Sequence, residues 1–159
     1  MKIKWMVIFV TLLLCSPFII PLVLNEPSVK EVRGEIEGVC RYWVYLPSEA
    51  EPGDLLPIKV KIRGLNIFGL DFIVSVRVIY GYKRASDWKD VIITHLTFLE
   101  EEEGITAVRI PIDVETGPVI IWLDIWYRGS DYYVIKKGKR TYVLWDTLIW
   151  GPYIKGYGP

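Results

Sequence analysis

The feature that most limits what this chain can fold into is an alternation of apolar and polar residues with a period of two. Its clearest stretch is residues 58–63, Ile-Lys-Val-Lys-Ile-Arg, which follows the turn sequence Pro52-Gly53-Asp54. Successive side chains of a strand point to opposite sides, so this stretch buries one face and exposes the other. No stretch beyond residue 30 has a sustained helical period. The pattern therefore predicts β-strands.

Runs of β-branched and aromatic residues, separated by turn residues, predict about seven strands in the rest of the chain. They lie near residues 39–46, 58–63, 72–80, 91–99, 107–112 and 119–127, followed by a hairpin of 132–135 and 141–145. Short strands without a helical insert predict an all-β fold, an antiparallel sandwich. The acidic residues 100–103 and the basic residues 136–140 are interpreted as solvated turns.

Two turn sequences carry a resemblance to a known group of domains. Pro52-Gly53-Asp54 precedes the second predicted strand, and Thr116-Gly117-Pro118 precedes the sixth. Over residues 39–145 the chain resembles immunoglobulin-like and fibronectin type III-like domains, many of which share this pattern. The resemblance implies an antiparallel immunoglobulin-like sandwich and a role in binding or scaffolding. The Cys–Trp–Cys arrangement of antibody-type domains is absent, because Cys40 is the only cysteine in this range.

The N-terminal part of the chain has a different character. Residues 5–24 run for twenty positions without a charged side chain, a length of about 30 Å as a helix and enough to cross a bilayer. Lys2 and Lys4 precede this run, so the positive-inside rule puts residues 1–4 in the cytoplasm. The sequence thus predicts one transmembrane helix at 5–24 that holds the later domain outside the cytoplasm, at the cell membrane.

A cleaved signal peptide, with secretion of the domain, is the alternative for this segment. Cleavage after Ser16 is disfavoured, because a leucine occupies the position where a small residue is wanted and Pro17 would begin the mature chain. The predicted organisation is completed by a juxtamembrane linker at 25–38, the sandwich at 39–146, and an aromatic tail rich in glycine and proline at 147–159.

Composition excludes several classes of function. Nineteen basic residues balance nineteen acidic ones, so nothing favours nucleic-acid binding. Cys15 and Cys40 lie on opposite sides of the predicted membrane boundary, so no disulfide is expected and Cys40 is predicted to be a buried apolar residue. His95 is the only histidine, and no nucleophile, metal or phosphate motif accompanies it. We expect no enzyme and no cofactor. The absence of Gln suggests a thermophilic source.

The sixth predicted strand carries the most suggestive chemistry. One face is apolar, and the other places Trp122 and Trp126 on either side of Asp124, with Arg128 beyond. Indoles beside a carboxylate can stack on a sugar or hold a partner's side chain. The structural interpretation, which the sequence favours, is that another segment covers this face or that both indoles complete a core around a paired Asp124.

The aromatic tail contributes Trp150, Tyr153 and Tyr157 among closely spaced glycines and prolines. That density predicts neither strand nor helix. The tail either lies back over the sandwich or docks on a partner. The functional hypothesis is a non-enzymatic, membrane-anchored module that binds an envelope protein or associates with itself through these residues. The alternative is a carbohydrate-binding module of the cell surface that uses Trp122 and Trp126.

Overall fold

The computed structural model describes residues 28–129, 134–136 and 139–156. The predicted anchor at 5–24 and Tyr157 of the predicted binding surface lie outside the described residues. In the described part of the chain, no helix is long and apolar enough to cross a membrane.

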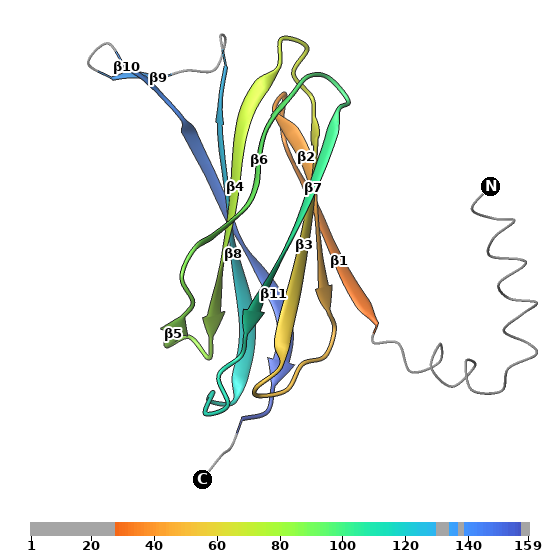
Figure 1. Cartoon of the computed structure of the whole chain (residues 1–159), viewed down its shortest axis with the longest axis vertical. Coiled ribbons are helices and arrows are strands. Elements are labelled where there is room, and N and C mark those ends of the chain that lie inside the picture. The colour runs from red at the N-terminus through yellow and green to blue at the C-terminus, as the bar shows by residue number, and fades with distance from the viewer. Residues whose placement is uncertain (1–27, 130–133, 137–138, 157–159) are drawn as a thin grey trace, which may run out of the picture.

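The described residues form two antiparallel sheets packed face to face, as Figure 1 shows. The first sheet has the order β1-β2-β3-β7; in the second, β11-β8-β4, both β5 and β6 also pair with β4. The predicted all-β antiparallel sandwich is therefore confirmed. The strands are β1 (Val29–Ile36), β2 (Cys40–Pro47), β3 (Leu55–Gly64), β4 (Leu70–Tyr80), β5 (Arg84–Ala85), β6 (Lys89–Leu96), β7 (Glu101–Arg109), β8 (Gly117–Arg128), β9 (Val134–Lys136), β10 (Lys139–Thr141) and β11 (Val143–Ile154).

The core lies between the two sheets and is built by the alternation that the sequence displays. The even positions of β3 and β4 and the odd positions of β8 point inward, where Ile58, Val74 and Ile121 are completely buried. Cys40 joins this core as predicted, and burial raises the pKa of its thiol to about 12. A thiol with so high a pKa is almost entirely protonated at neutral pH, so it is a poor nucleophile.

The side of the sandwich formed by β6 and β7 is tightly closed. A Cβ atom added to Gly104 in β7 would lie 2.1 Å from the carbonyl oxygen of Val91 in β6. Only glycine permits this approach, which brings the edge of one sheet against the other. On the opposite side, Tyr42 of β2 contacts Trp145 of β11, with ring centroids 5.2 Å apart.

The loops gather at two ends of the sandwich. The β1–β2, β3–β4 and β6–β7 connections lie at the upper end in Figure 1, and β1 begins and β11 finishes at the lower end. Backbone hydrogen bonds join the upper loops: Leu65 donates to Val39, and Leu99 donates to Gly64. The β9–β10 hairpin follows β8 and precedes β11, so it also extends from the upper end.

Two predicted boundaries were wrong. The segment predicted as a linker, 25–38, contains β1, which pairs with β2 from Val29 to Ile36. Residues 29–31 of this edge strand are exposed on both faces, and burial alternates only from Val32 to Ile36, which is a short stretch in which to recognise a half-buried strand. The predicted tail at 147–159 supplies the second half of β11, which pairs with β8 to Ile154 because a bulge between Trp150 and Tyr153 accommodates Gly151 and Pro152.

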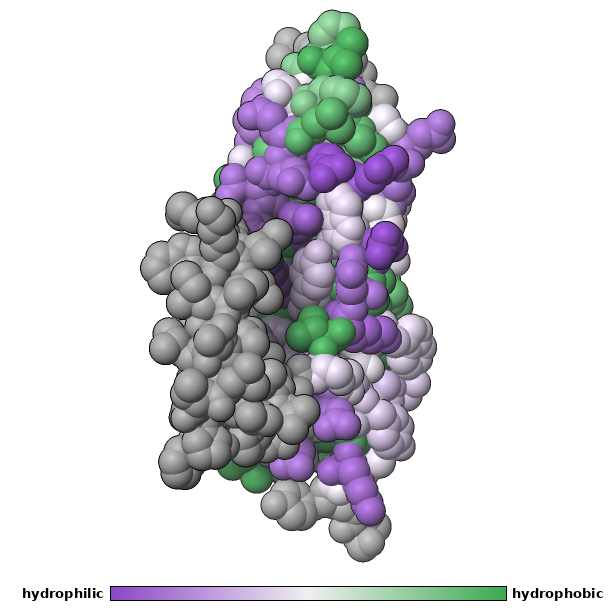
Figure 2. Space-filling model, turned by 90° about the vertical axis from the view of Figure 1, so that its right-hand side faces the viewer, coloured by the Kyte–Doolittle hydropathy of each residue, from purple (hydrophilic) through white to green (hydrophobic). Residues whose placement is uncertain are grey.

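The acidic cluster was also misplaced. Glu101, Glu102 and Glu103 lie in β7, not in a turn, and Glu101 and Glu103 face basic residues of β3. The ion pairs are Arg63–Glu101 at 2.8 Å, Lys59–Glu103 at 3.2 Å and Lys61–Glu101 at 3.8 Å. Figure 2 shows the resulting hydrophilic surface, with a hydrophobic group above it at the upper end. The exposed apolar residues of the upper loops are Ile67, Phe68, Phe98 and Leu99.

Candidate functional site

The candidate site is the outer face of the second sheet, which carries four of the predicted site residues from β8. The pairing of β8 with β4 and β11 fixes which side chains stand beside them. Trp126 lies between Ile73 and Leu144, and Trp122 lies between Arg77 and Leu148. Side chains opposite each other in neighbouring strands share a face. The face therefore has two rows that run across the strands: Ile73, Trp126 and Leu144 in one, and Arg77, Trp122 and Leu148 in the other.

A row of carboxylates separates these two apolar rows. The register places Asp90, Ser75, Asp124 and Asp146 side by side across β6, β4, β8 and β11. Asp90 reaches this face because a bulge between Val74 and Ser75 shifts the β4–β6 pairing by one residue. The hydroxyl of Ser75 donates to Asp90 Oδ1 at 2.6 Å. The sequence alone did not reveal this row, because three of its members come from strands other than β8.

Asp124 is the unusual member of the row. Its exposed fraction is 8%, and its Oδ1 atom is buried without a hydrogen-bond partner among the described residues. Burial, and then the neighbouring Asp146 carboxylate, raise the pKa of Asp124 above its ordinary value. One structural interpretation requires a partner for Asp124, and among the described residues its Oδ1 atom has no hydrogen-bond partner.

The two arginines of this face have other partners. Arg77 donates to the carbonyl oxygen of Ser86 at 2.8 Å and lies over the Trp88 ring at 5.7 Å. The Trp88 ring in turn meets Trp122 edge to face, with centroids 5.5 Å apart. Arg128 lies over the Tyr142 ring at 4.5 Å and donates to Asp71 at 3.3 Å. In the described part of the chain, neither arginine forms an ion pair with the carboxylate row.

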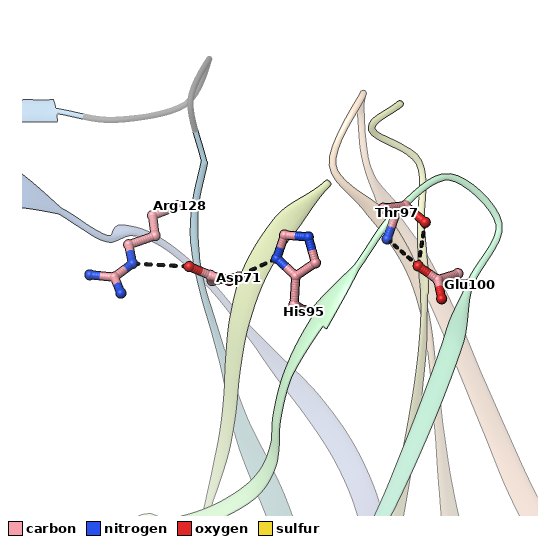
Figure 3. A network of polar contacts seen from close by, with 5 residues as sticks. All are labelled: Asp71, His95, Thr97, Glu100 and Arg128. Atoms are coloured by element: carbon pink, nitrogen blue, oxygen red, sulfur yellow. Dashed lines mark hydrogen bonds and ion pairs between the residues drawn. The ribbon is translucent and has the colours of Figure 1, made fainter. Parts of the chain in front are cut away.

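Asp71 also binds the only histidine of the chain, as Figure 3 shows. His95 Nδ1 lies 2.8 Å from Asp71 Oδ1, so a protonated Nδ1 donates to the carboxylate. This hydrogen bond, together with that from Arg128, lowers the pKa of Asp71. The other ring nitrogen faces the backbone of Gly69, where an added Cβ would lie 2.6 Å from Nε2.

A histidine and a carboxylate in contact are two members of a catalytic triad, so a nucleophile is the third requirement. Thr97, whose hydroxyl is drawn in Figure 3, donates to Glu100, which also accepts from the Thr97 backbone N–H. That hydroxyl is therefore bonded to Glu100 and not to His95. That His95 is structural stays a prediction.

The tail residues occupy the lower end of the sandwich. Trp150 is 53% exposed on the outer face, pairs with Ile120, and meets Tyr82 edge to face with ring centroids 6.2 Å apart. Tyr153 lies past the bulge and lines an open groove of about 880 Å³ with residues 48–52. The described part of the tail, to residue 156, thus continues the pairing of β11 with β8 and does not cover Trp122 and Trp126.

Exposed aliphatic residues beside the indoles were missed at the sequence level. Leu144, Leu148 and Ile93 have exposed fractions of 43%, 55% and 71%. The signal that could have found the first two is the alternation of 143–150, in which Leu144, Asp146, Leu148 and Trp150 share one side. Trp122 and Trp126 themselves are half-buried.

Comparison with known proteins gives no family for this chain. No family model matches it, and no curated protein matches it. Among solved structures, it is similar to Spo0M, a sporulation control protein from Bacillus subtilis, with 12% identity and a TM-score of 0.40 over 82% of this chain and 49% of that one. It is also similar to a β-glucosidase from Listeria innocua, with 10% identity and a TM-score of 0.31 over 83% of this chain and 16% of that one. Similarities this low identify neither a family nor an activity.

The buried carboxylate makes a prediction about stability. At pH 7, Asp124→Asn is expected to raise the free energy of unfolding by about 1 kcal/mol or more, because an uncompensated buried charge is removed. The pKa of Asp124 in the folded state is raised above its ordinary value of 3.8. The free-energy cost of burying its charge is therefore fully present above the folded-state pKa, and it disappears as the pH falls below 3.8. The gain should therefore vanish near about pH 3. Urea unfolding at both pH values measures it.

The matched control for this measurement is Asp146→Asn, which removes an exposed carboxylate from the same row. It relieves only part of the repulsion, so we expect a gain below about 0.5 kcal/mol. If Asp124→Asn destabilised the protein at pH 7, Asp124 would have a favourable partner in solution and the description of it as uncompensated would be wrong.

Proposed function

We propose that this protein is a non-enzymatic binding module, and that the outer face of the second sheet binds an envelope protein or a second copy of the chain. The observation that carries the proposal is the exposure of Leu144, Leu148 and Ile93 in rows that also contain Trp122 and Trp126. No described segment covers these rows. Contiguous exposed apolar groups that surround indoles and charged residues are typical of protein interaction surfaces.

A carbohydrate remains the alternative ligand. Trp122 and Trp126 are four residues apart on one strand, which separates them by about 14 Å. Sugar platforms need open ring faces, whereas Trp122 is half-buried and meets the edge of Trp88. Ile93 and Leu148, the most exposed apolar groups beside these two indoles, are aliphatic and offer a sugar no stacking surface. These features favour a protein partner.

We further propose that the sandwich is immunoglobulin-like. The seven main strands from β2 onward are β2, β3, β4, β6, β7, β8 and β11. The first, second and fifth of these (β2, β3 and β7) pair in one sheet, and the third, sixth and seventh (β4, β8 and β11) pair in the other. This is the grouping of strands A, B, E and C, F, G in that class. The chain departs from the class by the added β1, by the β9–β10 hairpin before the last strand, and by the lack of the Cys–Trp–Cys arrangement. A binding role suits a fold that presents a whole sheet face.

The proposed location is the outer side of the cell membrane, with residues 5–24 as a retained anchor. Support comes from the uncharged length of that segment and from the two lysines before it. Because β1 begins at Val29, the lower end of the sandwich would then lie close to the bilayer. The outer face of the second sheet runs along the length of the sandwich, so it would stay accessible to a neighbouring protein in the same membrane.

Leu148→Arg tests the binding proposal. Leu148 is exposed in an edge strand, so the substitution should fold normally, while a buried arginine at an interface should weaken association by about 30-fold or more. The measurement is recovery of the partner, or of the dimer, from native membranes solubilised in mild detergent, followed by light scattering. Point substitution is preferable to truncation, because residues 147–154 belong to β11.

Ile105→Arg is the control, since Ile105 is 69% exposed on the first sheet. It should leave association unchanged. The proposal is wrong if Leu148→Arg behaves like wild type, or if the wild-type protein is a monomer that recovers no partner.

The anchor is tested by sequencing the N-terminus of the mature protein and by extracting membranes with alkaline carbonate. A retained anchor predicts an intact N-terminus and protein that stays in the membrane pellet. A mature chain that begins between residues 16 and 25, and that is released into the supernatant, would show cleavage and secretion instead.

A further inference from the structure

The outer face of the second sheet carries a row of carboxylates that no cation of the described residues neutralises. Asp90, Asp124 and Asp146 lie in one row, and none of them forms an ion pair in the described part of the chain. The two arginines of this face, Arg77 and Arg128, are bound to the Ser86 carbonyl oxygen and to Asp71. An unpaired buried carboxylate is retained only at a cost, so its presence calls for a functional reason.

The first sheet shows how the same chain completes a similar surface. There, Trp43 is covered by Lys61, whose ammonium lies 4.6 Å from the ring centroid, and by Arg63 at 5.4 Å. Both cations also pair with Glu101. On the first sheet, the cations therefore contact both an indole and a carboxylate, so that the carboxylate is neutralised. The second sheet provides two indoles and two adjacent carboxylates but, among the described residues, no cation between them.

We propose that Asp124 and Asp146, together with the indoles of Trp122 and Trp126, form a binding site for a cationic side chain. The ligand is an arginine presented by the protein partner. The inference rests on the proposed function and specifies what the partner must offer. A guanidinium is planar, stacks on indoles, and donates in parallel to a carboxylate, whereas an ammonium does not match both features.

The two indoles of the site are held differently. Trp122 meets Trp88 edge to face, whereas Trp126 has no ring contact among the described residues. Asp146 is exposed and attracts the cation first. Contact with a cation then favours the ionised form of Asp124, which its burial otherwise disfavours.

The experiment uses the full-length protein in detergent micelles and follows the indole N–H signals by NMR. Arginine amide is the probe, and citrulline amide, which has a similar shape and the same α-amino group but lacks the guanidinium charge, is its control, at constant ionic strength. We expect arginine amide to shift the Trp122 and Trp126 signals in a saturable way and citrulline amide not to do so. The Trp43 signal should not move, because its own cations already cover it.

Two variants complete the test. Asp124→Asn should weaken the apparent affinity for arginine amide by about tenfold or more. Asp113→Asn makes the same change in net charge at the lower end, where Asp113 pairs with Arg84, and should leave the affinity unchanged. Equal shifts with citrulline amide, equal affinity in Asp124→Asn, or the absence of any saturable shift would each overturn the inference.

The outcomes separate this inference from the proposed function. If Leu148→Arg loses the partner but Asp124→Asn keeps it at full affinity, the face binds protein without an arginine at this site. If arginine amide binds as expected but the wild-type protein recovers no partner, the cation site stands and the proposed function fails. If neutral oligosaccharides shift the two indole signals and arginine amide does not, the site takes sugar.

Discussion

The register of β4 against β8 is the constraint on which the rest of this structure depends. It sets Val74 beside Ile125 on the inner side and Ser75 beside Asp124 on the outer side. The side-chain period of a strand is two, so a slip of one residue would exchange these sets. Trp122, Asp124 and Trp126 would enter the core, and the aliphatic residues would face water. The same pairing thus holds the core together and assembles the candidate site.

The two outer faces of the sandwich are completed in different ways. The first sheet covers its surface with ion pairs between β3 and β7, and its tryptophan with cations from β3. Such exposed pairs contribute little stability each, but they neutralise Glu101 and Glu103. The second sheet buries a carboxylate between indoles and exposes leucines beside it. A chain selected for stability alone would be expected to neutralise that row. The asymmetry is what makes one face a candidate for binding.

The sequence predicted what depends on local alternation and missed what depends on pairing. The inward faces of β3, β4 and β8 follow directly from their period of two, and so does the grouping of Trp122 with Trp126. The strand β1 was missed because its first three residues are exposed on both faces and its alternation covers only Val32 to Ile36. The second half of β11 was missed because Gly151 and Pro152 normally end a strand, and only the bulge opposite β8 allows pairing to resume at Tyr153.

The candidate site was predictable only in its central strand. Asp90, Ser75 and Asp146 are distant from Asp124 in the sequence, and they join it through three separate registers, one of which contains a bulge. No pattern along the chain encodes that row. The lack of a partner for Asp124 is likewise a property of the assembled face, because it depends on Arg77 and Arg128 binding other groups.

The central claim is that the outer face of the second sheet is a surface that the protein uses. Oxidative footprinting of native membranes, compared with the purified protein, tests it most directly, because oxidation reports solvent access to individual side chains. We expect Trp122, Trp126 and Leu148 to be oxidised in the purified protein and protected in native membranes, while Trp43 reacts equally in both. Equal oxidation of all four side chains in the two samples would contradict the account.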